Sequence, residues 1–330
     1  MKKLMVFGIS FASCMVVFLM TIFIFKEPIT NYLVSNNNLK LVGVLYGKNT
    51  LYDVVARNNY ISYKKDIDSN VISGSVSSDN VSNDKYEKEI LEKDDSTEGY
   101  KFINIEINGY KSYLIAIYDP SKVKLVSSRW FNRGNTGQQT VIDICKRYNG
   151  KVCINGGGFQ DSGYGSDIPT GVVIQDGEIT WGADTADTAR DNIIGLTKDG
   201  KLKLMTNATA NEALKANIND AMVFGPFLIV NGKPLEIVGD PWGYAPRVAI
   251  GQTKSGIILF LVVDGENYIN GASLQDMVDI LTRYGAYNAA NLDGGQSSSL
   301  SINGKLYNNP PAAAKRQGGR YVVTGWGLIK

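Results

Sequence analysis

One carboxylate stands at the end of an apolar segment and is followed at once by glycines and serines. Residues 287–292, YNAANL, predict a short buried strand, and residues 293–298 read DGGQSS. A strand of this kind delivers Asp293 to the edge of a sheet, and the N–H groups and hydroxyls of the following loop can face an anion. The pattern therefore predicts a carboxylate beside an anion-binding loop.

The chain has no histidine at any of its 330 positions. This excludes the Ser-His-Asp and Cys-His mechanisms and every metal site with a histidine ligand. The chemistry of a catalytic site must consequently use carboxylates, Arg, Lys, Ser, Tyr and backbone dipoles.

A second carboxylate, Asp264, ends the apolar segment IILFLVV. A helix predicted at residues 273–284 separates this strand from the one that ends at Asp293, so the two strands belong to a strand–helix–strand unit. If they run parallel in one sheet, both carboxylates emerge at the same edge. The preceding segment PRVAIG predicts a hairpin partner for the first strand. It brings Arg247 between the carboxylates, where its planar guanidinium can hold a phosphate.

The strand predicted at residues 152–155 ends in the same way, with Asn155 followed by three glycines. Consecutive glycines permit the close approach of a ligand or form a nest of N–H groups. Each such feature alone is more often an ordinary turn or bulge, and their combination is what favours a functional site. The predicted substrate-binding residues are Asn155, Gly156, Gly157, Gly294, Gly295, Gln296, Ser297, Ser298 and Arg320.

A divalent cation is the alternative to a metal-free site. Asp264, Asp293 and Asn155 supply oxygen ligands of the kind that Ca²⁺ and Mg²⁺ prefer. Their spacing matches no EF-hand loop, so we predict a site without a cofactor and keep a Ca²⁺ or Mg²⁺ ion as the alternative.

Six turn signals, most of them Asn-Gly or Asp-Gly, separate apolar or alternating segments within residues 99–330. These dipeptides accept the positive φ angles of type I′ turns, so each predicts a hairpin. They lie at 108–109, 176–177, 199–200, 231–232, 255–256 and 303–304. Helices are predicted at residues 140–148 and 273–284. Hairpins with a few interleaved helices predict a single, strand-rich α+β domain over residues 99–330.

The N-terminal part predicts export. Two lysines precede an uncharged, mostly apolar run at residues 4–25, and roughly 20 such residues span a bilayer. Residues 1–26 therefore predict a transmembrane signal anchor, with a long cleaved signal peptide as the alternative. Residues 27–98 are rich in Ser, Asn, Asp and Lys and predict a largely disordered stalk. The expected location is the cell membrane, single-pass, with the domain on the extracellular face.

The charge of the chain indicates which partners to expect, and its cysteines indicate in which compartment it folds. The chain has 34 basic and 32 acidic residues, without the clustered cations of a nucleic-acid-binding surface, so no nucleic acid is expected. Cys145 and Cys153 flank a predicted helix-to-strand turn. An exported protein allows them to form a disulfide, and two buried thiols are the alternative.

Six motifs occur here in the order of the phosphodiester glycosidase family, which the chain resembles over residues 119–328. The motifs are INGGGF at 154–159, GPFL at 225–228, PRVAIG at 246–251, VDG at 263–265, GASL at 271–274 and NLDGGQSS at 291–298. NLDGG is the most specific. The chain departs from the family pattern at Gly158-Phe159, where two aromatics are common, and at Gln296, where a third glycine is frequent. Gln296 can add hydrogen bonds to a different sugar.

The resemblance implies hydrolysis of a sugar C1–O bond to a phosphodiester, and the predicted export places the expected substrate in cell-surface or cell-wall glycans. A phosphate leaves readily as an anion, so such a site needs an anion clamp and a carboxylate more than a strong acid. We expect Asp293 to be nucleophile or base, Asp264 the second carboxylate, and Arg247 the clamp together with the glycine and serine loops. Arg320 is a further candidate for the clamp. The alternative is a carbohydrate-binding or envelope-assembly module without turnover.

Overall fold

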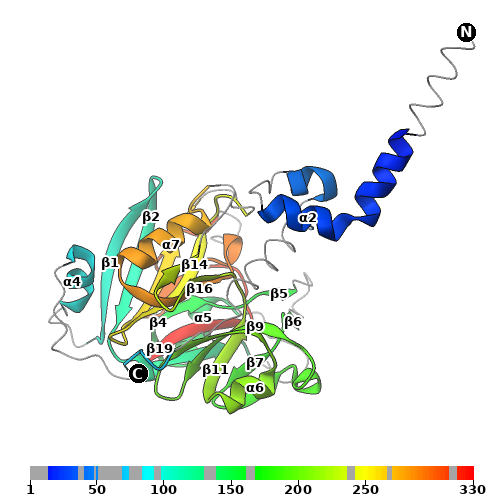
Figure 1. The fold of residues 1–330 in the computed structure, drawn as a ribbon. Coiled ribbons are helices and arrows are strands. Elements are labelled where there is room, and N and C mark those ends of the chain that lie inside the picture. Colours follow the sequence, from blue (N-terminus) through cyan, green and yellow to red (C-terminus); the bar gives the residue numbers. More distant parts are fainter. Residues whose placement is uncertain are drawn as a thin grey trace, which may run out of the picture. The chain divides into compact units, whose positions relative to one another are not determined.

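The computed structural model describes residues 14–35, 41–47, 50, 69–73, 84–92, 98–129, 139–160, 168–235, 242–265, 270–311 and 318–330. Contacts between residues divide the chain into two units. One comprises residues 1–61 and 238–241, and the other comprises residues 62–237 and 242–330. Every predicted site residue lies in the second unit, which Figure 1 shows as a stack of strands with a few helices.

The first unit contains helix α2 (Lys26–Ser35). Residues 14–24 of the predicted anchor are helical, and residues 1–13 lie outside the described part of the chain. Among the described residues, no helix combines the length and the apolar character that crossing a membrane requires.

Seven strands form the largest sheet, in the order β1-β2-β15-β14-β16-β12-β13. Their bounds are β1 (Tyr100–Ile107), β2 (Tyr110–Ile117), β12 (Phe227–Val230), β13 (Lys233–Pro234), β14 (Arg247–Thr253), β15 (Ile258–Val263) and β16 (Ala286–Leu292). Both β15 and β16 are antiparallel to β14, so they are parallel to each other. The expected common edge is confirmed, with β14 inserted between the two parallel strands.

Two five-stranded sheets complete the architecture. One has the order β10-β9-β11-β7-β8, and the other has the order β18-β17-β4-β19-β3. The bounds in the first are β7 (Val173–Gln175), β8 (Glu178–Trp181), β9 (Asp191–Thr197), β10 (Leu202–Ala208) and β11 (Ile218–Val223). Those in the second are β3 (Val123–Ser127), β4 (Gly150–Asn155), β17 (Leu300–Ile302), β18 (Lys305–Leu306) and β19 (Thr324–Ile329). A small pair joins β5 (Phe159–Gln160) to β6 (Ile168–Pro169).

All six predicted turns join antiparallel neighbours, which confirms the hairpins. Four of them have positive φ at both central residues, as type I′ turns require: 108–109, 176–177, 231–232 and 303–304. The strand-rich α+β class is therefore confirmed.

The helices of the second unit are short and capped. They are α4 (Lys85–Leu91), α5 (Val141–Arg147), α6 (Ala210–Lys215) and α7 (Leu274–Arg283), with 3-10 turns η1 (Pro120–Lys122), η3 (Ala183–Thr185) and η4 (Gly295–Ser297). Both predicted helices are present as α5 and α7. A capping box at Ser273 begins α7, and α7 covers one face of the seven-stranded sheet (Figure 1).

The other face of this sheet packs into a core that all three large sheets share. Its buried members include Phe260 from the seven-stranded sheet, Ile194 from the second and Trp326 from the third. Burial of such side chains is the main force that holds the sheets together. Two sheets that meet in one core bring their strand ends close, and this determines the position of the site.

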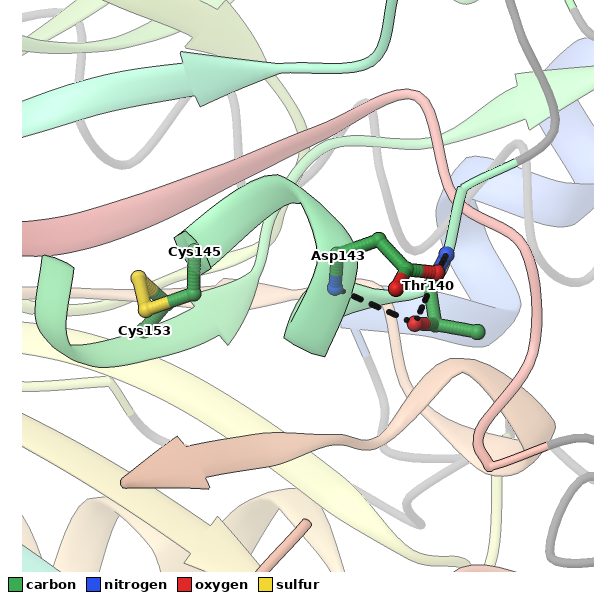
Figure 2. Close-up of a disulfide and its surroundings, with 4 residues drawn as sticks. All are labelled: Thr140, Asp143, Cys145 and Cys153. Carbon is green, nitrogen blue, oxygen red and sulfur yellow. Dashed lines mark hydrogen bonds between the residues drawn. A yellow bond between two sulfur atoms is a disulfide. The ribbon is translucent and has the colours of Figure 1, made fainter. Parts of the chain in front are cut away.

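A disulfide ties α5 to the strand that follows it. Thr140 and Asp143 form a capping box at the start of α5, and Cys145 in its second turn is bonded to Cys153 in β4 (Figure 2). The disulfide is thus present rather than two thiols. Because β4 ends at Asn155, the helix and the bridge together fix a strand that leads directly to the site.

Part of the predicted stalk belongs to the core. Ile90 of α4 is buried against the α7 side of the large sheet, and the Tyr118 hydroxyl donates to its carbonyl at 2.9 Å. Ile72 is also buried, and Ser73 N donates to Lys254 O at 2.9 Å. The domain boundary expected at residue 99 therefore leaves out packed residues. The rest of that segment lies largely outside the described residues.

Candidate functional site

Asp293 lies immediately after β16, where two sheets meet. The strand ends at Leu292 because the following glycines turn the chain into η4. Asp293 N donates to Gly156 O at 2.9 Å, and Asn155 Nδ2 donates to the Asp293 carbonyl at 2.6 Å. The end of β4 in one sheet thus holds the end of β16 in the other, which fixes the backbone of Asp293.

Donors surround the Asp293 carboxylate. It accepts hydrogen bonds from the Gly294 N–H and the Ser297 hydroxyl, and Arg320 Nη1 donates to Ser297 Oγ at 3.2 Å. Burial raises the pKa of Asp293 to about 6, although Ser297, the Arg320 charge and Gly294 each lower it. At neutral pH the group is consequently ionised and still basic enough to take up a proton.

The positively charged side chain near Asp293 is Arg320, which the sequence analysis named as a further candidate for the clamp. Its guanidinium carbon lies 4.9 Å from the centre of the Phe159 ring, an arrangement in which the ring face attracts the charge. Both side chains are partly exposed. A ligand can therefore reach a guanidinium whose position is set by the aromatic ring on one side and by Ser297 on the other.

Asp264, the second predicted carboxylate, is buried and surrounded by donors. Its oxygens accept from the Tyr113 hydroxyl at 3.2 Å, from Asn308 Nδ2 at 3.1 Å and from Asn309 N at 2.9 and 3.0 Å. Burial raises its pKa, against the lowering effect of these hydrogen bonds and of the Lys111 charge. These contacts give Asp264 the function of an anchor for the turn after β18.

Asn308 joins the two carboxylates through one side chain. Its Nδ2 donates both to Asp264 and to the Ser298 carbonyl at 3.0 Å, and its Oδ1 accepts from Leu300 N at 2.7 Å. Ser298 is the neighbour of Ser297, which contacts Asp293. A displacement of Asp264 is therefore transmitted to the loop that holds the Asp293 carboxylate.

Arg247 does not lie between the two carboxylates as expected. It pairs with Val263 across the β14–β15 hairpin, and successive residues of a strand point to opposite faces. Arg247 therefore lies on the α7 side, whereas Asp264, one residue further, lies on the other. The buried guanidinium donates to the carbonyls of Ala272 and Gly243 at 3.2 and 2.7 Å. It holds the loops next to the site.

The predicted glycine nest is engaged by the protein itself. Gly156 N donates to the Thr324 carbonyl at 2.9 Å, and Gly157 N donates to the Thr324 hydroxyl at 3.1 Å. A Cβ at Gly156 would stand 2.5 Å from Met222 Cε, and one at Gly157 would stand 2.9 Å from Val223 O. These glycines permit the sheets to approach and do not present their N–H groups to an anion.

The loop after Asp293 divides into residues at the surface and residues beneath it. Gly294, Gly295 and Gln296 are partly exposed, whereas Ser297 and Ser298 are fully buried. Gly295 N donates to Pro246 O at 2.8 Å. The Ser298 hydroxyl is buried with no hydrogen-bond partner in the described part of the chain. Of the two serines, only Ser297 contacts Asp293.

The oxygen atoms considered as metal ligands are directed to different partners. Asn155 Oδ1 accepts from Ser299 N at 2.9 Å, and Asp264 is held by Tyr113 and Asn308. In the residues that the structure describes, no group of three or more Asp, Glu or Cys side chains gathers around one point.

Several residues of this network were not identified from the sequence, among them Phe159, Tyr113 and Asn308. Phe159 belongs to the INGGGF motif, so the motif contained the signal. Tyr113 reads as an ordinary strand aromatic, and Asn308 is separated from Asp264 by 44 positions. Neither spacing nor residue type indicates these last two contacts.

Comparisons with known proteins point to one family. The sequence model of the phosphodiester glycosidase family matches residues 148–329. The chain is 30% identical over 199 residues to the SPbeta prophage-derived uncharacterized protein YomE of Bacillus subtilis, covering 58% of this chain and 30% of that protein. It is 24% identical over 198 residues to the N-acetylglucosamine-1-phosphodiester alpha-N-acetylglucosaminidase of Mus musculus, covering 58% and 34%. The chain thus spans about a third of these relatives.

A solved structure has a similar fold. The zebrafish N-acetylglucosamine-1-phosphodiester alpha-N-acetylglucosaminidase catalytic domain, auto-inhibited by its pro-peptide, superposes with a TM-score of 0.59 at 20% identity. The superposition covers 72% of this chain and 85% of that domain.

Proposed function

Because the chain belongs to the phosphodiester glycosidase family, we propose that it hydrolyses the C1–O bond of a sugar-1-phosphodiester at Asp293. The water gives up one proton, which Asp293 takes up and passes to solvent, and its oxygen bonds to C1; the C1–O bond breaks, and the phosphate monoester leaves with the electron pair. This leaving group is a stable anion at neutral pH, so no strong general acid is needed at the leaving oxygen. A histidine-free site can perform this reaction.

The observation that carries the proposal is the pairing of Asp293 with Arg320 through Ser297. A carboxyl group with a pKa of about 6 is ionised at pH 7, and it can act as nucleophile at C1 or as the base that activates water. Arg320 is partly exposed and offers the planar fork that suits a phosphate. Ser297 hydrogen-bonds to both groups and orients them.

The second carboxylate takes a supporting role in this proposal. Asp264 is held by Tyr113, Asn308 and Asn309, so we assign it to positioning and not to the reacting carbon. Arg247 supports the loops from the opposite face of the sheet. Gln296, three residues after Asp293, is partly exposed and is the residue that we expect to contact the sugar.

We further propose that the protein acts outside the cytoplasm on cell-surface or cell-wall glycans, tethered by its N-terminal apolar segment. The Cys145–Cys153 disulfide supports this location, because such bonds persist mainly in oxidising compartments. Fractionation of cells that produce the full chain, with protease treatment of intact cells, tests the location. A protein found only in the cytosolic fraction would refute it.

The catalytic test uses the full chain and a panel of sugar-1-phosphodiesters in ¹⁸O-labelled water. C1–O cleavage places the label in the free sugar, whereas P–O cleavage places it in the phosphate. We expect labelled sugar from the wild type and from Asp279→Asn, an exposed helix position, and none from Asp293→Asn. Labelled phosphate would refute the mechanism. Binding without turnover would instead identify a carbohydrate-binding module.

A further inference from the structure

A cavity of about 570 Å³ opens beside the β1–β2 hairpin, lined by Asn104, Ile105, Glu106, Lys111, Tyr113 and Tyr307. A volume of this size accommodates a small ligand. Two of these residues also contact or influence Asp264: the Tyr113 hydroxyl donates to it, and the Lys111 charge lowers its pKa.

The hairpin register explains why polar side chains meet there. Asn104 pairs with Tyr113 and Glu106 pairs with Lys111, so all four side chains point to the same face of the sheet. Further along this face the side chains are apolar and belong to the shared core. The cavity begins where the core ends, and the exposed side chains of Asn104, Glu106 and Lys111 have no hydrogen bond or ion pair in the described part of the chain.

One wall of the cavity is a rigid aromatic surface. The Tyr307 ring lies edge-on to the Tyr113 ring at 5.4 Å and to the Phe102 ring at 4.8 Å. Yet 48% of Tyr307 remains exposed. An aromatic ring that its neighbours hold in place, with its remaining surface open, offers a large contact area at low entropic cost.

The two exposed charges at the cavity are opposite in sign. Glu106 and Lys111 stand opposite each other, so their opposite charges cancel at a distance and select neither an anion nor a cation. At close range they offer an acceptor and a donor, and the Asn104 amide offers both. A neutral ligand with many hydroxyl groups and one apolar face satisfies all of these groups.

The cavity is joined to the proposed reaction site by hydrogen bonds. The Tyr113 hydroxyl donates to Asp264, and the residue after Tyr307 is Asn308, which links Asp264 to the Ser298 carbonyl. The wall of the cavity and the loop that holds Asp293 therefore belong to one connected network.

We propose that this cavity is a subsite for a neutral sugar ring of the glycan substrate, stacked on Tyr307 and hydrogen-bonded to Asn104, Glu106 and Lys111. The assignment of the sugar to a substrate rests on the proposed function. The binding itself does not, because it requires no turnover.

The test is a titration of the full chain carrying Asp293→Asn with three neutral oligosaccharides: chitotriose, maltotriose and mannotriose. Calorimetry or saturation-transfer NMR reports the affinity. We expect at least one to bind, Tyr307→Ala to weaken it by about tenfold, and Asn104→Ala and Glu106→Gln to weaken it severalfold. Asp279→Asn, at an exposed position of α7 on the opposite face of the sheet, is the control and should bind like the parent.

The outcomes separate the two proposals. Absence of binding by all three sugars, or binding unchanged in both Asn104→Ala and Glu106→Gln, would overturn the subsite. These two positions are exposed, so their replacement does not endanger the fold. If the sugar binds in a manner that depends on Tyr307 but the wild type releases no sugar, the subsite proposal stands and the glycosidase proposal is refuted. If the protein releases sugar and none of the three replacements changes its KM, the glycosidase proposal stands and the subsite proposal is refuted.

Discussion

Replacement of Asp293 by asparagine should make the protein more stable at neutral pH while it abolishes activity. The pKa of Asp293 is raised from 3.8 to about 6 in the folded protein. An unfolded chain ionises this carboxyl more easily, so ionisation favours unfolding as the pH rises above the unfolded pKa. A difference of about two pKa units corresponds to about 3 kcal/mol. Partial exposure of the side chain makes this an upper value.

The pH dependence distinguishes this effect from any fixed consequence of the substitution. The loss of folding free energy caused by the ionised Asp293 should be nearly absent at pH 3.5, grow between about pH 4 and pH 6, and remain constant above that range. Asparagine keeps the shape and can still accept from Ser297, so contacts change little. Burial also raises the pKa values of Asp220 and Asp264, but both proteins contain these groups and their contributions cancel.

The assay is urea unfolding of wild type and Asp293→Asn at several pH values, with the difference in unfolding free energy plotted against pH. We expect the variant to gain about 2–3 kcal/mol relative to the wild type between pH 3.5 and pH 8. A difference that stays constant over this range would show that Asp293 titrates normally. A variant that loses relative stability as the pH rises would show that its pKa is lowered, and either result refutes our account of the site.

Three further predictions concern the groups around Asp293 and the disulfide. Ser297→Ala should lower kcat/KM by about tenfold to a hundredfold, because a hydrogen bond to a charged group is lost. Ser298→Ala, which removes a hydroxyl with no partner in the described residues, should change kcat/KM less than twofold. Equal losses in the two variants would contradict the role assigned to Ser297. Arg320→Met should lower kcat/KM by about a hundredfold or more and move the acidic limb of the pH–rate profile to higher pH, since the Arg320 charge lowers the pKa of Asp293; an unmoved limb would argue against their coupling. Reduction of the Cys145–Cys153 bridge should cost about 2–3 kcal/mol in urea unfolding, as the loss of a short closed loop predicts, and an unchanged midpoint would count against it.

Much of the fold follows from local signals. The Asn-Gly and Asp-Gly turns predicted their hairpins because the required positive φ angles are a property of these residues alone. The capping box at Ser273 and the apolar face behind it predicted α7. Helix α6 carries an equivalent signal, Thr209 with Glu212 three residues later, which the sequence reading overlooked. Helix α4 is different, because only its contact with the distant α7 face makes it part of the core.

The sequence predicted the parts of the site that depend on where a strand ends. It did not predict the parts that depend on which face of the sheet a side chain occupies or on which distant residue it contacts. Asp293 follows a buried strand, and the pattern placed it correctly at the sheet edge. The prediction for Arg247 was wrong because it considered only the neighbouring strand and not the face of the sheet. Arg247 pairs with Val263 and shares its face, whereas Asp264, one residue further, points to the opposite face. The N–H groups of Gly156 and Gly157 are engaged by Thr324, a contact that no local pattern reveals.

The sheet order also determines when the protein can fold. Val123 in β3 pairs with Leu328 in β19, and Ile115 in β2 pairs with Phe260 in β15. Strands that the ribosome makes early therefore wait for partners far along the chain, which gives the domain a high contact order and slow closure. During translation the early strands lack their native partners and the nascent chain stays open. The same topology delays the shared core until β19 has been made, because Trp326 of β19 belongs to that core.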